Sequence, residues 1–187
     1  DGKSRFRSVV SIEKDDFSHQ TLLLRHFFRH FPNGQAPDEY YDFLAGRISL
    51  IELFASYPDA YADAQRSALK VTLGPDSRST VRRVISDRLA GAERWALVGG
   101  PPCQAYSLVG RSRMMGKPDF EQDERHTLYL EYLRIIVDHR PPVFVMENVK
   151  GLLSATIEGK SAINRIVADL SQPGRAIHGA PSNLTYK

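Results

Sequence analysis

Short apolar runs along this chain alternate with longer segments in which apolar residues recur every three or four positions. The apolar runs predict strands, and we expect buried strands at residues 8–13 and 143–149, a strand at 95–98 and a further short strand at 71–73. Each run precedes a polar or glycine-rich stretch, which is typical of a strand that ends in a functional loop.

The longer segments have the spacing of helices with one apolar face. We expect helices at residues 17–31, 79–89, 127–139 and 161–170, and an extra pair of helices within residues 37–70. The sequences "FPNG" and "RPP" end the first and third of these helices, and the tail from Ser171 has little pattern. Strands that alternate with helices in this way predict an α/β fold with a parallel sheet.

Composition narrows the class of protein without choosing a function. A chain of 187 residues with 42% hydrophobic and 25% charged residues fits one globular domain. The single cysteine excludes an internal disulfide framework and suits a reducing compartment. We find no apolar run near the roughly 18 residues that a membrane span needs, and we assign no metal ligands. The formal charge of +3 permits a nucleic-acid partner but does not require one.

Three residues with reactive or acidic side chains follow predicted strands. Glu13, Cys103 and Glu147 each stand where a strand gives way to a loop. A lone cysteine is more often a small buried hydrophobe, and a lone glutamate is usually solvated. Functional groups in parallel sheets gather at the carboxyl ends of the strands, however, and a carboxylate beside a buried strand costs desolvation unless it has a partner or a task. We therefore predict that Cys103 and Glu147 form a nucleophile and acid pair.

These residues carry a resemblance to the DNA (cytosine-5) methyltransferases. In "GGPPCQAYS", residues Pro102, Cys103, Gln104 and Ser107 match the family's Pro-Cys-Gln loop. In "FVMENVKGLL", Glu147 and Asn148, followed by Val149, match its Glu-Asn-Val motif. The resemblance is specific across residues 95–155, because both motifs and the intervening helix agree, and it is weaker across 8–34.

The resemblance implies a reaction for these side chains. Cys103 would add to carbon 6 of cytosine, Glu147 would hydrogen-bond ring nitrogen 3 and the exocyclic amine, and S-adenosylmethionine would supply the methyl group to carbon 5. The cytosine would be flipped out of double-stranded DNA. The polar loop 104–122 would contact the DNA, with Arg111 and Arg113 on its phosphates.

The resemblance also implies cofactor contacts and a setting. Glu13 matches an acid that binds ribose hydroxyls, although Lys14 departs from the apolar residue usual at the next position. Asp76 matches an acid near the adenine amine, or it is a helix N-cap, and the backbone of Leu128 would approach the cofactor. The family's restriction–modification members place such a protein in the bacterial cytoplasm rather than the nucleus.

Several family motifs are missing from the sequence. The Phe-x-Gly-x-Gly turn does not precede Ser8, and the Gln-x-Arg-x-Arg motif and target-recognition region are also absent. The resemblance thus implies that residues 1–187 form part of a catalytic domain, with a Rossmann-like S-adenosylmethionine-dependent methyltransferase sheet that is incomplete and a helical insertion at 35–70. We predict that the chain alone is inactive, binds the cofactor weakly and self-associates through exposed apolar strands.

Three alternatives remain open at this stage. A tRNA cytosine-5 methyltransferase would share both motifs. A non-catalytic, methyltransferase-like binding module would explain the missing cofactor turn. A cysteine hydrolase would need a histidine beside Cys103, and His126 and His139 lie on the predicted helix between the motifs, although their spacing gives no reason to expect either at the thiol.

Overall fold

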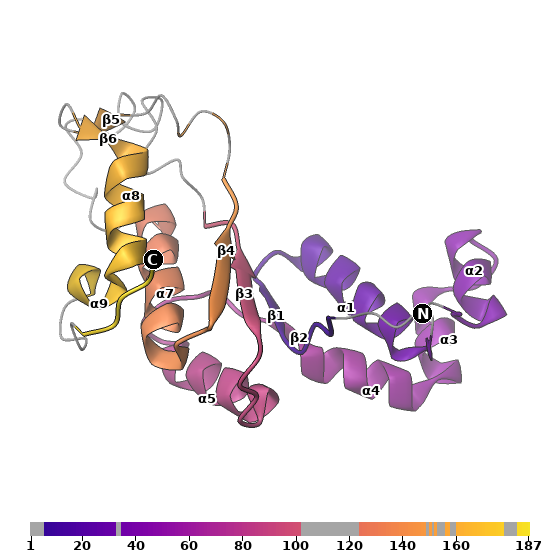
Figure 1. The fold of residues 1–187 in the computed structure, drawn as a ribbon. Coiled ribbons are helices and arrows are strands. Elements are labelled where there is room, and N and C mark those ends of the chain that lie inside the picture. The colour runs from indigo at the N-terminus through magenta and orange to yellow at the C-terminus, as the bar shows by residue number, and fades with distance from the viewer. Residues whose placement is uncertain are drawn as a thin grey trace. The chain divides into compact units, whose positions relative to one another are not determined.

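A computed structural model describes residues 6–32, 35–101, 124–148, 150, 152, 156–157, 160–177 and 183–187. The chain divides into two compact units, residues 1–72 and residues 73–187. The elements follow in the order β1 (Ser11–Glu13), α1 (Asp16–His30), α2 (Asp38–Leu44), α3 (Leu50–Ser56), α4 (Pro58–Ser67), β2 (Ala68–Lys70), α5 (Arg78–Leu89), β3 (Ala96–Gly99), α7 (Glu124–His139), β4 (Val143–Met146), β5 (Thr156–Ile157), β6 (Lys160–Ser161), α8 (Ala162–Ser171) and α9 (Pro173–Ala176) (Figure 1).

The first unit pairs two short parallel strands with a group of helices. Strand β1 lies beside β2 in the register Ser11↔Ala68 to Glu13↔Lys70, and α1 packs along α4. Asp15 caps α1, since its side chain accepts a 2.8 Å hydrogen bond from the backbone of Ser18. Aromatic and aliphatic side chains of α1, α3 and α4, together with the first residue of β2, form the core, which includes Leu23, Phe27, Leu53, Phe54, Ala60, Ala64 and Ala68.

The second unit contains another parallel pair, β3 and β4, with Ala96 opposite Val143 and Gly99 opposite Met146. Helix α7 covers one face of this pair, where its buried side chains meet Leu97 and Phe144. Helix α5 and helix α9 both contact α7, and a short antiparallel pair, β5 and β6, precedes α8. The core cluster of this unit consists of Tyr129, Tyr132, Leu133, Ile136, Leu152, Ala162, Ile166 and Ile177.

The expected α/β class is confirmed, because small parallel sheets alternate with helices. The predicted helices at 17–31, 79–89, 127–139 and 161–170 correspond to α1, α5, α7 and α8. Within the described residues, however, the strands form separate two-stranded sheets rather than one continuous parallel sheet. The insertion predicted at 35–70 stays a prediction.

Four local predictions were wrong. The strand expected at 71–73 lies at 68–70, because pairing with β1 fixes its register. The first helix of the extra pair is broken at Gly46, which has a φ of +72°, and a new helix begins with the Ser49–Glu52 capping box. Strands β1 and β4 are partly exposed rather than buried. The patternless tail contains the short helix α9.

Candidate active site at the carboxyl ends of two parallel strands

The parallel pairing of β3 and β4 brings their carboxyl ends to one edge. The backbone N–H of Glu147 donates a 2.9 Å hydrogen bond to the carbonyl oxygen of Gly99, which continues the pairing one step beyond β4. The residue that follows β3 and the residue that follows β4 therefore meet at this edge, as expected for parallel strands.

Gly100 lies directly against the side chain of Glu147. A Cβ atom added at position 100 would lie 2.7 Å from the Cγ of Glu147 and 2.8 Å from its Oε1. Only glycine at position 100 leaves room for the carboxyl group of Glu147 here. Gly100 begins the segment between β3 and α7, residues 100–123, which contains Cys103 and is called the cysteine loop below. Glu147 is exposed, so the desolvation cost expected from a buried strand does not arise.

Tyr132 of α7 lies behind this edge and contacts both strands. Its ring is so close to Gly99 that an added Cβ would lie 2.7 Å from Cε2, and its hydroxyl donates a 3.1 Å hydrogen bond to the carbonyl oxygen of Val145. Burial raises the pKa of Tyr132 to about 12. Sequence reasoning missed this residue, although a tyrosine on the apolar face of a helix signals a hydroxyl that needs a partner.

Most residues of the predicted cysteine loop lie outside the described residues. This group comprises the predicted nucleophile, the residues predicted to support it and the predicted DNA contacts, namely Pro102, Cys103, Gln104, Ser107, Arg111 and Arg113. Asn148 is described, is exposed and follows Glu147 directly. The structure thus places Glu147 at the strand edge that leads into the loop, and the pairing of Cys103 with Glu147 stays a prediction.

Glu13 ends β1 in the first unit, as predicted. Its Oε1 accepts hydrogen bonds from the backbone N–H groups of Lys14, at 2.8 Å, and Asp15, at 2.9 Å. These bonds fix the carboxylate over the turn between β1 and α1. A half-buried carboxylate in this position is an acceptor, which is the chemistry that a ribose hydroxyl requires.

The other two predicted cofactor residues belong to the second unit. Asp76 is exposed in the turn between β2 and α5, which is closed by the backbone bond from Ser77 N–H to Gly74 O at 3.1 Å. The N-cap of α5 is Ser77, so the alternative interpretation of Asp76 as an N-cap is wrong. Leu128 is half-buried in the second turn of α7.

A cysteine hydrolase would need a histidine near the edge at which β3 and β4 end. His139 is the last residue of α7 and precedes β4, so it lies toward the amino end of that strand, whereas Glu147 follows the carboxyl end. Burial lowers the pKa of His139, and its Nε2 is buried without a hydrogen-bond partner among the described residues. The side chain of His126 lies outside the described residues. The hydrolase alternative thus gains no support from His139.

The described ranges also bear on two other classes of protein. Within those ranges, no three histidine, cysteine or acidic side chains gather closely enough to hold a metal ion. In the same part of the chain, no helix combines the length and the hydropathy needed to cross a membrane.

Curated relatives of the chain are named as methyltransferases. The Type II methyltransferase M.Bpa9945I of Bacillus paralicheniformis is 33% identical over 171 residues, which cover 82% of this chain and 38% of the relative. M.AquIA of Picosynechococcus is 43% identical over 77 residues, or 41% of this chain and 28% of the relative. M.FnuDI of Fusobacterium nucleatum is 33% identical over 97 residues, or 52% and 25%. The chain thus spans well under half the length of these relatives. No solved structure matches it.

A family model gives stronger evidence for the family of this chain than any single relative does. The model described as C-5 cytosine-specific DNA methylase matches residues 82–178, which is more than half of the chain. The matched range contains β3, the cysteine loop, α7 and β4, and therefore the whole edge at which Gly100 meets Glu147. The chain belongs to the C-5 cytosine-specific DNA methylase family.

Proposed function

We propose that this chain supplies the nucleophile and the acid of a DNA (cytosine-5) methyltransferase. The observation that carries the proposal is the meeting of Gly100 and Glu147 at the carboxyl edge of β3 and β4, two residues of separate sequence motifs. Family membership and the names of the relatives support the reaction class. The finer fold we propose is a Rossmann-like sheet to which β3 and β4 contribute neighbouring strands.

In the proposed reaction, Cys103 begins the chemistry as a thiolate. Its sulfur adds to carbon 6 of the target cytosine, so that a C–S bond forms and the ring electrons move to carbon 5. Carbon 5 would then take the methyl group, whose bond to the sulfonium sulfur of the donor breaks and leaves a neutral thioether. Carbon 5 next loses its proton to a base, and the electrons of that C–H bond restore the ring double bond as the C–S bond to Cys103 breaks. The ring ends as 5-methylcytosine and Cys103 ends as the free thiolate.

Glu147 would stabilise the ring while its aromaticity is lost. In its protonated form the carboxyl group donates to ring nitrogen 3, and its other oxygen accepts from the exocyclic amine. This role needs a carboxyl group that is open to the base, and Glu147 is exposed at the strand edge. The absence of a side chain at Gly100 supports the same role, because a larger residue would displace the carboxyl group.

The proposed methyl source is S-adenosylmethionine, as the resemblance to the family implies. Bound S-adenosylmethionine supplies an electrophilic methyl group. Glu13 would accept from the ribose hydroxyls, because its carboxylate is held by the amides of Lys14 and Asp15. The proposed partner of Asp76 is the adenine amine, and the backbone of Leu128 is proposed to approach the cofactor.

The proposed substrate is a cytosine in double-stranded DNA, extruded from the helix. Arg111 and Arg113 would neutralise phosphates beside it. Relatives from Bacillus paralicheniformis and Fusobacterium nucleatum bear Type II methyltransferase names, which supports a restriction–modification role in the bacterial cytoplasm.

A covalent-adduct experiment tests this proposal. Duplex DNA that carries 5-fluorocytosine blocks the final proton loss, so a protein containing this chain and its flanking gene sequence should form an adduct that survives a denaturing gel. The Cys103→Ser variant should form none. An adduct of equal yield in Cys103→Ser would remove Cys103 from the mechanism.

The acid is tested separately. Glu147→Gln should lower the rate of adduct formation by about 10²-fold while duplex binding changes little, because acid–base groups typically contribute this much to a reaction. A Glu147→Gln protein that reacts at the normal rate would contradict the role of Glu147 without affecting that of Cys103.

A further inference from the structure

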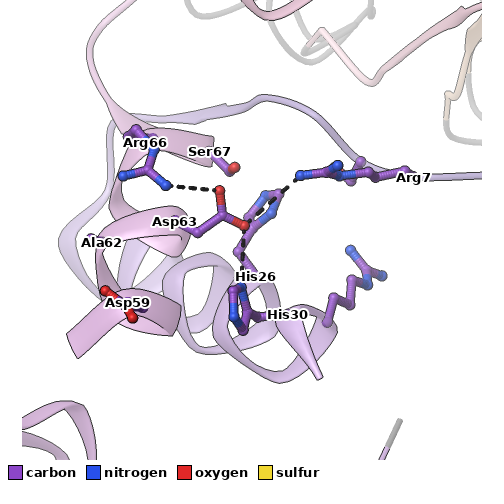
Figure 2. A pocket seen from close by; sticks show the side chains of 10 residues that line it. Arg7, His26, His30, Asp59, Ala62, Asp63, Arg66 and Ser67 are labelled. Carbon is purple, nitrogen blue, oxygen red and sulfur yellow. Dashed lines mark hydrogen bonds and ion pairs between the residues drawn. The ribbon is translucent and has the colours of Figure 1, made fainter. Parts of the chain in front are cut away.

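The unit formed by residues 1–72 contains a pocket that the proposed methyl transfer does not use. The pocket has a volume of about 690 Å³ and lies between α1, α4 and the chain segment before β1 (Figure 2). None of its lining residues falls within the range that the family model matches. They are Arg7, Ser8, His26, Arg29, His30, Asp59, Ala62, Asp63, Arg66 and Ser67.

Basic side chains dominate this lining. Three arginines face two aspartates, which leaves an excess of one positive charge with both histidines neutral. The guanidinium group is always charged and presents several N–H donors in one plane, a geometry that suits phosphate oxygens. The hydroxyl of Ser67, at the end of α4, adds a further polar group to the same wall.

Asp63 is the centre of the charged groups in the pocket. Its carboxylate lies 3.2 Å from Arg66 Nη2, 3.5 Å from His30 Nδ1 and 3.9 Å from Arg7 Nη2 (Figure 2). Burial raises the pKa of Asp63, but hydrogen bonds from His30 and Arg66 outweigh that effect and lower it overall. The carboxylate therefore occupies the place of an anion among polar side chains from three segments, two of which are arginines.

Arg29 takes no part in the group of charged side chains around Asp63. It lines the pocket, and it forms no ion pair or side-chain hydrogen bond with any residue in the part of the chain that the structure describes. Arg7 is joined to Asp63 only at the long distance of 3.9 Å, and its side chain is largely exposed. Two cations are thus available to an external anion without loss of the closer Arg66–Asp63 pair.

We propose that this pocket binds a phosphate group, with Arg7, Arg29 and Arg66 as its cationic donors. One phosphodiester carries a single negative charge, which matches the excess of one positive charge in the lining. The phosphate can come from a nucleic-acid backbone or from a free phosphate ion. The backbone source would rest on the proposed DNA substrate, whereas the site itself stands apart from methyl transfer.

Substitution of Asp63 tests the proposal, because we expect phosphate affinity to rise rather than fall. The carboxylate competes with phosphate for the same cations, so Asp63→Asn should tighten phosphate binding. A purely structural role for Asp63 predicts the opposite, because loss of its charge would release Arg66 and His30 and loosen the pocket.

The experiment measures binding to the 187-residue chain by calorimetry with inorganic phosphate and by fluorescence anisotropy with a labelled duplex of arbitrary sequence. Arg29→Gln and Arg66→Gln should each weaken binding by about 10-fold, since a charge-assisted hydrogen bond commonly contributes that much. Arg47→Gln is the matched control, because the Arg47 side chain is 63% exposed and paired with Asp42, while Arg66 is 60% exposed and paired with Asp63. Circular dichroism confirms that each variant is folded.

The two ligands distinguish the source of the phosphate. If the duplex binds through this pocket, Arg29→Gln should also reduce the salt dependence of duplex binding by about one ion. If only inorganic phosphate responds to the variants, the ligand is a free anion. The proposal is overturned if neither ligand binds, if Arg29→Gln and Arg66→Gln behave like Arg47→Gln, or if Asp63→Asn weakens phosphate binding. None of these results bears on the Cys103 adduct, so each proposal can fail alone.

Discussion

The ring of Tyr132 lies against the backbone of Gly99, and a Cβ atom at position 99 would come within 2.7 Å of its Cε2 and 3.0 Å of its Cδ2. The ring has little room to yield, because Tyr132 is buried and its hydroxyl is bonded to Val145 O. The contact fixes how closely α7 approaches β3, and with it the start of the cysteine loop.

Gly99→Ala should therefore destabilise the chain. The expected loss in the free energy of unfolding is about 1–3 kcal/mol, which is typical of an extra methyl group in a packed site. Urea unfolding measures it. Gly74→Ala is the control, since a Cβ there meets nothing within 4 Å. The double variant Gly99→Ala/Tyr132→Leu should recover part of the loss, and a Gly99→Ala chain as stable as Gly74→Ala would contradict the contact.

The neighbouring change, Gly100→Ala, should act on function instead. The atoms that an added Cβ would meet belong to Glu147, whose exposed side chain can rotate away at little cost in stability. The displaced carboxyl group would then no longer meet the flipped base. A misplacement of about 1 Å typically lowers the rate about 10²-fold. The rate of adduct formation with 5-fluorocytosine DNA tests this beside urea unfolding. A variant that loses stability but keeps the rate would reverse our assignment of the two glycines.

Sequence patterns predicted the helices of this chain better than its strands. Helical periodicity is a local property, so α1 and α7 lay close to their predicted bounds. Strand positions depend on a partner elsewhere, which is why β2 begins at Ala68 and not at Val71. The break at Gly46 was missed because the apolar pattern continues on both sides of it.

The candidate site was predictable in part for a similar reason. The position of Glu147 after a strand could be predicted because strand ends are visible in a sequence. The contacts of Gly100 with Glu147 and of Gly99 with Tyr132 join segments more than 30 positions apart, and no spacing rule connects them. The pocket in residues 1–72 was missed because its charged residues are scattered over α1, α4 and the segment before β1, where the sequence pattern resembles ordinary surface.

The raised pKa of Tyr132 predicts a loss of stability in alkali. The value in the folded chain is about 12, against 10.0 for an ordinary tyrosine, because burial disfavours the phenolate. The stabilising contribution is therefore complete below pH 10 and is lost as the pH rises toward 12. The fall in unfolding free energy over this range should be smaller in Tyr132→Phe than in the unchanged chain. Equal slopes in the two proteins would show that Tyr132 ionises normally.

The ion pair between Arg78 of α5 and Glu131 of α7 predicts that replacing Arg78 costs more stability than replacing Glu131. Glu131 Oε1 accepts from Arg78 Nε at 2.8 Å and from Nη2 at 2.5 Å. The side chain of Glu131 is 4% exposed, whereas that of Arg78 is 37% exposed. Arg78→Met would leave a buried carboxylate without its cation and should cost about 3 kcal/mol. Glu131→Gln leaves an arginine that can reach water and should cost less.

Thermal unfolding of the two variants at neutral pH measures this difference. Arg47→Met provides the comparison for an exposed pair, because Arg47 and Asp42 are both more open to solvent, and its effect should be below about 1 kcal/mol. Equal losses of stability in Arg78→Met and Glu131→Gln would mean that leaving the buried carboxylate without its cation carries no extra cost.

The face of β3 and β4 that α7 does not cover predicts self-association. Its side chains include Val98, Val143 and Val145, which are 68%, 57% and 50% exposed. Val98 lies opposite Val145 in the register, so the two form one continuous apolar strip. Exposed apolar strips on sheets favour association with another copy. Light scattering should therefore show a mass above 21.1 kDa that rises with protein concentration.

Val98→Thr/Val145→Thr should reduce this association without unfolding the chain. Threonine keeps the β-branched shape that strands favour, and exposed substitutions usually change the unfolding free energy by less than about 0.5 kcal/mol. The matched control is Val81→Thr, because Val81 is buried in α5 and its replacement should cost stability without reducing association. The decisive comparison is the scattering mass of the double variant at the highest concentration of the unchanged chain. If both proteins have the same mass there, the valine strip does not hold the copies together.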